Sequence, residues 1–240
     1  MSIDLSLQPG LFVVGTDTGV GKTAVACALA RIAHRSGKTF VPFKPVETGC
    51  SPDPADARAL WLAADQPVPV EQVVRYTFPL PAAPSVAATA AGITVDILSI
   101  VDRAASLRSQ GAGLLVEGAG GLLVPFAGTS TTVDIALCLA LPLLLVGRAA
   151  LGTINHCCLA TNEIRRRGLA LAGIILVETS PGSHDPKLDN LRQIELISGV
   201  RPLGVLPFVT DPSPDRLADA LLAALGAYRV ARLLGDRSAL

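Results

Sequence analysis

Residues 15–23 read GTDTGVGKT, and together with their neighbours they decide the fold class. An apolar run at residues 11–14 precedes this loop and an alanine-rich stretch at residues 24–33 follows it, as in a strand, a glycine-bearing loop and the start of a helix. Such a loop turns backbone N–H groups toward phosphates, and the helix N-terminus adds a favourable dipole. The ending Gly21-Lys22-Thr23 supplies a lysine for the outer phosphates and a hydroxyl for Mg²⁺. The stretch therefore predicts a nucleoside triphosphate site.

The spacing of the loop departs from the general motif in one respect. Five residues separate Gly15 from Gly21 where the general motif has four, and Thr16 stands in place of the usual first glycine. A Gly-Lys-Thr that occurs in a loop by chance is the alternative interpretation. The strand pattern before the loop and the helix pattern after it favour the phosphate site.

Short apolar runs alternate with stretches of helical periodicity along most of the chain. We expect strands at residues 11–14, 39–44, 114–117, 143–146, 173–177 and 203–207. We expect helices at residues 22–35, 56–64, 94–109, 132–140, 153–167 and 189–198. Because such alternation implies right-handed crossovers, it predicts an α/β fold, a parallel sheet flanked by helices of the phosphate-binding-loop NTPase type.

The organisation predicted for the chain is simple. No stretch has the composition of an interdomain linker and no internal repeat is visible, so residues 1–240 are expected to form a single domain. The richest loops in proline and glycine are residues 48–56, 76–84 and 179–186. A looser tail is expected after Asp211.

Composition excludes several classes of protein. The 240 residues are 50% hydrophobic and 17% charged, which is typical of a folded globular chain. Twenty basic residues balance twenty acidic ones, so a broad basic face for nucleic acid is not expected. The longest apolar run, residues 135–147, contains Pro142 and is shorter than the roughly 20 residues of a membrane span. Residues 1–9 carry Asp4 and lack the basic start of a secretory signal, so we expect no membrane segment and a cytoplasmic location.

Three further polar residues follow from the expected strand order, because ligands bind at the carboxyl ends of parallel strands. Glu117 ends an apolar run and precedes Gly118-Ala119-Gly120-Gly121, which lets the backbone approach a ligand; a solvated strand end is the alternative. Lys44 ends another run, either directed at the phosphates or as an ordinary strand-end lysine. Asp56 is either a metal ligand or a helix cap.

A second possible anion site lies at residues 152–156, which follow an expected strand and begin an expected helix. Free N–H groups at such a position favour a carboxylate or phosphate. Plain capping of the helix by Thr153 or Asn155 is the alternative.

Four segments together resemble the dethiobiotin synthetases of biotin biosynthesis. They are Gly15-Thr16-Asp17-Thr18-Gly19-Val20-Gly21-Lys22-Thr23, Lys44-Pro45-Val46-Glu47-Thr48-Gly49, Val116-Glu117-Gly118-Ala119-Gly120-Gly121 and Leu151-Gly152-Thr153-Ile154-Asn155-His156. Their order and spacing also fit, so the resemblance covers nearly the whole chain. It implies an ATP- and Mg²⁺-dependent ligase that works as a homodimer with its substrate at the subunit interface.

The resemblance implies the following reaction. An amine of 7,8-diaminononanoate reacts with CO₂, available from bicarbonate, to give a carbamate. ATP phosphorylates the carbamate to a carbamic-phosphoric anhydride and leaves as ADP. The second amine then displaces phosphate and closes the cyclic urea of dethiobiotin.

Roles for individual residues also come from the resemblance. Lys22 would hold the β and γ phosphates, and Lys44 would stabilise the charge shared by the γ-phosphoryl group and the attacking carbamate. The implied Mg²⁺ ligands are Thr23, Asp56 and Glu117. The implied nucleotide-binding residues are Thr18, Gly19, Val20, Gly21, Lys22, Thr23, Asp56, Glu117, Gly118, Ala119, Gly120, Val177, Glu178, Pro207, Phe208 and Val209. The implied substrate-binding residues are Thr18, Lys44 and Thr48 around the amines, and Gly152, Thr153, Ile154 and Asn155 of the other subunit around the carboxylate.

One departure from the family pattern and two rival interpretations remain. Val177 stands where better-known members of the family have an adenine-reading Asn, and valine cannot hydrogen-bond a base edge, so weak discrimination among bases is expected. A partitioning or assembly ATPase of the deviant phosphate-loop class is the closest rival, but such proteins carry an early lysine where this loop has Asp17. A cobalamin-pathway amide-forming enzyme would need a glutaminase domain, for which the chain has no room.

Overall fold

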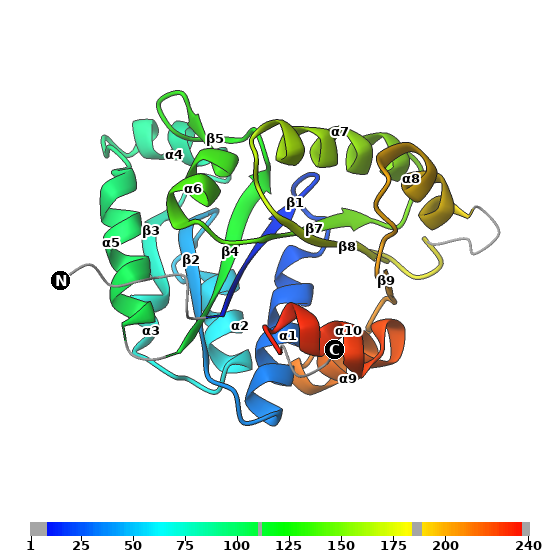
Figure 1. The fold of residues 1–240 in the computed structure, drawn as a ribbon. Coiled ribbons are helices and arrows are strands. Elements are labelled where there is room, and N and C mark those ends of the chain that lie inside the picture. The colour runs from blue at the N-terminus through cyan, green and yellow to red at the C-terminus, as the bar shows by residue number, and fades with distance from the viewer. Residues whose placement is uncertain (1–8, 110–111, 184–188, 237–240) are drawn as a thin grey trace.

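The fold is organised around β1 (Gly10–Gly15), the strand that leads into the glycine-bearing loop. A computed structural model describes residues 9–109, 112–183 and 189–236. In it β1 pairs in parallel with β4 (Gly113–Gly121) on one side and with β7 (Leu143–Arg148) on the other (Figure 1). Phe12 faces one layer of the core and Val13 the other, which is why the strand is apolar throughout.

Seven strands form the main sheet in the order β3-β2-β4-β1-β7-β8-β9, and every neighbouring pair in it is parallel. The remaining strands of this sheet are β2 (Phe40–Thr48), β3 (Val74–Phe78), β8 (Leu171–Val177) and β9 (Gly204–Leu206). A separate antiparallel hairpin consists of β5 (Pro125–Ala127) and β6 (Ser130–Thr131). Because a parallel sheet directs all its strand ends to one edge, the loops after β1, β2 and β4 meet there.

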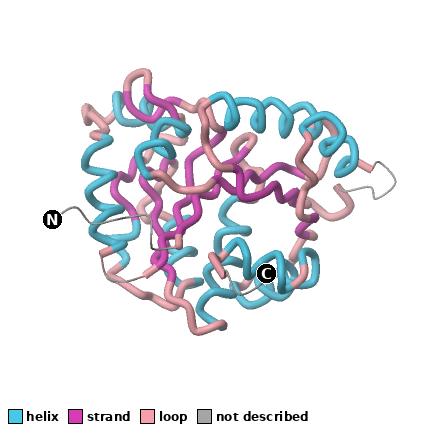
Figure 2. Tube along the Cα trace, viewed as in Figure 1, coloured by secondary structure: helices cyan, strands magenta, loops and turns pink. Residues whose placement is uncertain are grey.

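Helices cover both faces of the sheet, as the alternating pattern of the sequence predicts (Figure 2). One apolar layer lies under α4 (Pro84–Ala90), α5 (Ile97–Arg108), α6 (Thr132–Leu139), α7 (Thr153–Arg166) and α8 (Asn190–Ser198). The other lies under α1 (Lys22–Arg35), α2 (Ala55–Ala63), α9 (Pro214–Leu225) and α10 (Ala227–Leu233). A short helix, α3 (Val70–Val73), precedes β3. The parallel α/β fold predicted from sequence is confirmed.

The looser tail expected after Asp211 is wrong. α9 begins with Pro214 directly after Ser213, whose hydroxyl accepts a hydrogen bond from the backbone N–H of Arg216. Leu217, Leu221 and Leu225 then recur at intervals of four residues and are buried in the layer shared with α1. This end of the chain is therefore part of the core, and its proline start and apolar spacing are sequence signals of a helix.

The loop expected at residues 76–84 is also partly wrong, because β3 runs through Phe78 and α4 begins at Pro84. In β3, exposed Arg75 and Thr77 alternate with more buried neighbours. Such alternation is typical of an edge strand with one solvent-facing side, and a search for continuous apolar runs misses it. Among the described residues, no helix is both long and apolar enough to cross a membrane.

Asp134 links the start of α6 to the end of α7. Its Oδ2 accepts hydrogen bonds from the backbone N–H and the hydroxyl of Thr131, both at 2.7 Å, and its Oδ1 accepts one from Arg167 at 2.8 Å. Arg167 also donates to Glu163 on α7. Burial alone would raise the pKa of the Asp134 carboxyl, but these hydrogen bonds outweigh burial and lower the pKa below its ordinary value.

We expect Asp134→Asn to lower the free energy of unfolding by about 1 kcal/mol at pH 7, since it removes a charged helix cap and an ion-pair partner. A carboxyl with a lowered folded-state pKa stabilises fully above its unfolded pKa of about 4, and this contribution is lost as pH falls through the folded value. Urea unfolding between pH 7 and pH 3 should show the gap between wild type and variant closing in acid. Asp102→Asn, at an exposed position on α5, is the matched control. A gap that stays constant with pH contradicts the assignment.

Candidate nucleotide and metal site

The glycine-bearing loop sits at the centre of the edge where the parallel strands end. Its first residue after β1 is tied to the sheet, because the backbone N–H of Thr16 donates to the carbonyl of Val146 at 2.9 Å. The carboxylate of Asp17 stabilises the middle of the loop. Its Oδ1 accepts a hydrogen bond from the backbone N–H of Thr18 at 2.7 Å, and its Oδ2 lies 2.5 Å from Nη2 of Arg148. The side chain of Lys22 folds back over the loop and donates to the Asp17 carbonyl at 2.9 Å. The loop is thus held in shape from β7 as well as from its own helix.

Gly21 has a steric as well as a conformational requirement. Its φ of +94° lies in the left-handed region, and a Cβ at this position would come within 2.6 Å of a methyl group of Val177. Gly19 has a similar φ of +70°, but a Cβ there would meet nothing within 4 Å. The end of β8 therefore packs directly against the base of the loop.

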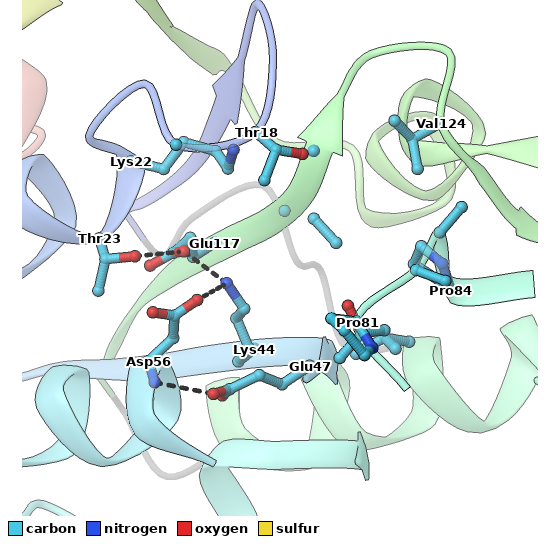
Figure 3. A pocket seen from close by; sticks show the side chains of 18 of the residues that line it. Thr18, Lys22, Thr23, Lys44, Glu47, Asp56, Pro81, Pro84, Glu117 and Val124 are labelled. Carbon is cyan, nitrogen blue, oxygen red and sulfur yellow. Dashed lines mark hydrogen bonds and ion pairs between the residues drawn. The ribbon is translucent and has the colours of Figure 1, made fainter. Parts of the chain in front are cut away.

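A pocket of about 630 Å³ opens beside the loop (Figure 3). Its walls come from the loop and start of α1, from the ends of β2 and β4, from the start of α2 and from the segment that leads into α4. The lining residues are Thr18, Gly19, Gly21, Lys22, Thr23, Lys44, Val46, Glu47, Thr48, Asp56, Pro81, Ala82, Ala83, Pro84, Glu117, Gly118, Ala119, Gly120 and Val124.

The floor of the pocket holds a buried ionic cluster of Lys44, Asp56 and Glu117. Nζ of Lys44 lies 2.8 Å from Oδ2 of Asp56 and 2.5 Å from Oε1 of Glu117. The same Glu117 oxygen accepts a hydrogen bond from the hydroxyl of Thr23 at 2.9 Å. The parallel pairing of β2 with β4 brings Lys44 and Glu117 to adjacent strands, and α2 brings Asp56. The side chains of Lys44 and Glu117 are only 4% and 1% exposed, so the pair interacts in an environment of low dielectric.

Burial and neighbouring charges set the protonation of the two lysines differently. Burial disfavours the charged form of Lys44, yet the carboxylates of Glu117 and Asp56 overcome it and raise the Lys44 pKa above its ordinary value. Burial lowers the pKa of Lys22 to about 8, although Glu117 opposes this change. For Asp56, burial is likewise outweighed by the Lys44 ammonium, which lowers the carboxyl pKa. Lys44 is therefore a permanent cation at neutral pH.

The oxygen atoms near Lys44 fit a hard divalent cation. Oε2 of Glu117 is buried and has no hydrogen-bond partner, the Asp56 side chain is 42% exposed to the pocket, and the Thr23 hydroxyl lies beside them. Oxygen ligands of this kind suit Mg²⁺, which usually keeps several waters and binds through one or two carboxylates and substrate phosphates. In the part of the chain that the structure describes, no cluster of three or more His, Cys, Asp or Glu side chains could hold a metal by itself.

Most of the residues predicted from sequence come together at this pocket, but some lie elsewhere. Val20 is fully buried below the loop in the same apolar layer as Val177, so neither side chain faces the pocket. Glu178 accepts a hydrogen bond from the backbone N–H of Phe208 at 3.1 Å, which clips the end of β8 to the residues after β9. Pro207 and Val209 lie on either side of Phe208 in the chain and do not line the pocket.

Strand ends are the least accurate part of the prediction. Lys44 and Glu117 were expected to end their strands, but β2 continues to Thr48 and β4 continues to Gly121. Sequence reasoning also missed the role of Glu47, whose carboxylate binds the start of α2, and the apolar wall that contains Val124. The Glu47 contact spans nine residues, so no local motif indicates it.

The second predicted anion site lies outside the pocket. Gly152 has a φ of +91° and α7 begins at Thr153, whose side chain is buried and lies 3.6 Å from the thiol of Cys157. A separate, mostly apolar hollow of about 430 Å³ lies between the loop and the exposed face of α7. Leu123 and Leu159 line it although they are 60% and 62% exposed.

Comparison with known proteins gives a consistent set of relatives. A family profile described as an AAA domain matches residues 9–216. The ATP-dependent dethiobiotin synthetase BioD of Anaeromyxobacter dehalogenans strain 2CP-1 is 46% identical over 220 residues, which cover 91% of this chain and 97% of that relative. The protein of the same name from Bacillus cereus strain G9842 is 37% identical over 201 residues, 83% of each chain. A solved structure, the MinC:MinD cell division protein complex of Aquifex aeolicus, has a chain with TM-score 0.58 at 14% identity, covering 95% of this chain and 96% of that one; this likeness concerns the fold alone.

Gly21→Ala should weaken triphosphate binding by more than tenfold, because the new methyl group would meet Val177 and force the loop away from β8. Gly19→Ala is the matched control, since it carries the same left-handed strain, about 1–2 kcal/mol, without the contact. The added substitution Val177→Ala should restore part of the affinity in the Gly21→Ala background. Calorimetric titration with a non-hydrolysable triphosphate measures all four proteins. Equal losses for the two alanine variants would show that the contact is unimportant.

Proposed function

The chain belongs to the family of ATP-dependent dethiobiotin synthetases, and on this premise we propose that it joins 7,8-diaminononanoate and CO₂ into dethiobiotin at the expense of ATP. The observation that carries the proposal is the pocket itself, where a phosphate loop faces a buried cation, Lys44, held between two carboxylates.

We propose that the triphosphate lies along the loop, with the β and γ phosphates at Lys22. An amine of the diamine adds to CO₂ and loses a proton, and the carbamate oxygen then attacks the γ-phosphorus while ADP leaves. The second amine attacks the carbamoyl carbon, phosphate leaves and the ring closes. Lys44 is proposed to support the middle step, because its buried ammonium on the pocket floor would stabilise the negative charge that spreads over the transferring phosphoryl group.

Thr23, Asp56 and Glu117 would hold Mg²⁺ in this proposal. When bound, Mg²⁺ neutralises phosphate charge and polarises the phosphoryl group. The hydroxyl of Thr23 already contacts Glu117, so the two side chains need little movement to share a ligand. The partly exposed carboxylate of Asp56 would complete the set from the opposite wall.

The amines are proposed to bind near Thr18, Lys44 and Thr48, all of which line the pocket. The aliphatic chain would then run along Val46, Val124 and the proline-rich segment before α4.

A second subunit is proposed to complete the site. Residues 152–155 do not line the pocket of their own chain, so Gly152, Thr153, Ile154 and Asn155 could reach the distal carboxylate of the substrate only from a partner. The exposed Leu159 beside this helix start, with Leu123 opposite, supports a face of this kind.

The base is proposed to lie near Val177, Glu178 and the segment Pro207-Phe208-Val209, with contacts that are apolar or made by the backbone. Val177 offers no hydrogen bond to a base edge and is buried against the loop. Phosphate contacts would then supply most of the nucleotide affinity.

Phosphate release from ATP and Mg²⁺ should require both 7,8-diaminononanoate and bicarbonate, with dethiobiotin identified by mass. Lys44→Ala should lower the rate by about 10²- to 10³-fold, the effect of removing a preorganised charge from a transition state. Lys38→Ala, a lysine outside the pocket, is the control. Release that ignores the diamine would instead place the chain with switch ATPases, whose partners are proteins.

CTP and GTP should support the reaction with kcat/KM values within about tenfold of that for ATP. A bidentate contact to a base is worth about 1–3 kcal/mol, and Val177 cannot make one. Steady-state kinetics with the three triphosphates under the same conditions test this. Strict dependence on ATP would mean that other groups read the adenine.

Sedimentation at assay concentrations should give a mass near twice the 24.7 kDa of one chain. Leu159→Asp should shift this mass toward that of the monomer and abolish turnover while triphosphate binding persists, because the loop belongs to one chain. Leu98→Asp, at a leucine on α5 that is 72% exposed against 62% for Leu159, should change neither property. A wild-type monomer with full activity would rule out a shared site.

A further inference from the structure

The helix that carries Asp56 begins without a cap of its own. α2 starts at Ala55 after Pro54, and no side chain at the N-cap position accepts a hydrogen bond. The first N–H groups of a helix have no partner inside it, and leaving them unsatisfied in a partly buried place is costly. Another part of the chain therefore has to supply an acceptor.

Glu47, near the end of β2, supplies that acceptor with both of its oxygens. Oε1 accepts from the backbone N–H of Asp56 at 2.8 Å, and Oε2 accepts from the backbone N–H of Ala57 at 2.9 Å. Glu47 is 6% exposed, so these two bonds are shielded from water. A carboxylate at a helix N-terminus also interacts favourably with the helix dipole. Glu47 is thus a bidentate cap that reaches α2 from a neighbouring strand.

The Glu47 cap binds the backbone of Asp56, the residue whose carboxylate contacts Lys44. The backbone N–H of Asp56 donates to Glu47, and the carboxylate of Asp56 accepts from the Lys44 ammonium at 2.8 Å, as the dashed lines in Figure 3 show. Lys44 and Glu47 both belong to β2, so the strand fixes the backbone of Asp56 with one side chain and its carboxylate with the other. The position of the Asp56 carboxylate therefore depends on Glu47.

We propose that Glu47 is a positioning residue, which caps α2 so that Asp56 presents its carboxylate to a cation bound with the triphosphate. The inference rests on the proposed function, because it assumes that Asp56 is a cation ligand. Both Glu47 oxygens are engaged by backbone N–H groups, so Glu47 acts through Asp56 rather than on the reacting atoms.

The two oxygens of Glu47 make its replacement informative. In Glu47→Gln the amide oxygen can still accept one N–H, but the amide NH₂ group faces the other N–H as a second donor. Glu47→Ala removes both acceptors. The two variants should therefore form a graded series, with Gln between wild type and Ala.

The test measures Mn²⁺ binding to the protein saturated with a non-hydrolysable ATP analogue, by electron paramagnetic resonance. Glu47→Gln should weaken Mn²⁺ binding about tenfold, in line with the loss of a charged cap, and Glu47→Ala should weaken it further. Affinity for the analogue without metal should change less than twofold, because both Glu47 oxygens bind the start of α2 rather than the phosphate loop. In turnover assays the variants should raise the Mg²⁺ concentration needed for half-maximal rate more than they lower the maximal rate.

A helix cap far from the pocket provides the matched control. Asp96 caps α5 with one oxygen, which accepts from the backbone N–H of Leu98 at 2.9 Å. Asp96→Ala should lower thermal stability as Glu47→Ala does but leave Mn²⁺ binding unchanged. A double-mutant cycle with Asp56→Ala completes the design: if Glu47 acts through Asp56, adding Glu47→Gln to Asp56→Ala should cause no further loss.

Two results would overturn the inference: wild-type Mn²⁺ binding in Glu47→Gln, or losses that add in the double variant. Neither depends on turnover, so each is distinct from failure of the proposed function, which would appear as phosphate release that ignores the diamine. If Asp56→Ala alone left Mn²⁺ binding intact, Asp56 would not be a cation ligand and the inference would fail with it.

Discussion

The architecture of the site depends on one buried interaction, the Lys44 ammonium between the carboxylates of Asp56 and Glu117. A charge that is nearly excluded from water is stable only when opposite charges lie within contact distance. Removing one member of such a pair costs more folding free energy than the intact pair contributes, because the remaining charge stays buried without a partner. This requirement dictates much of what surrounds it. β2 and β4 have to be neighbours in the sheet, and the first turn of α2 has to be held at a fixed position against β2. The parallel sheet supplies the first condition and the Glu47 cap supplies the second.

The fold could be predicted from sequence largely because its central strands are buried on both faces. The runs that became β1, β4, β7 and β8 are continuous and apolar, and each is followed by a helical pattern. Edge strand β3 was missed because its exposed Arg75 and Thr77 interrupt the apolar run. α9 was missed although Ser213 and Pro214 mark its start and leucines recur every four residues along it. A strand that is buried on one face only has a weaker hydrophobic pattern in the sequence than a strand that is buried on both faces.

The parts of the site built from consecutive residues could be predicted from sequence, and the contacts between separate elements could not. The loop from Gly15 to Thr23 encodes its own shape, since consecutive residues supply the turn, the lysine and the hydroxyl. The grouping of Lys44 with Glu117 required the order of the strands, which the pattern of alternation provides only in outline. The Glu47 cap joins β2 to α2, and the packing of Val177 against Gly21 joins β8 to the loop. Both contacts depend on how separate elements are placed in space, and no sequence motif indicates either of them.

The same packing of Val177 against Gly21 has a consequence for how the protein can diversify. The described side chains around the proposed triphosphate site come from the chain before residue 125, whereas those proposed for the base and for the second subunit come after residue 150. The residues proposed for the phosphates and the amines therefore lie in the first half of the sequence, and those proposed for the base and the distal carboxylate lie in the second. Val177 is one of the places where the two halves pack against each other, because its side chain lies against Gly21. Any side chain that evolution or a protein engineer installs there to read a base inherits a size limit set by the phosphate loop.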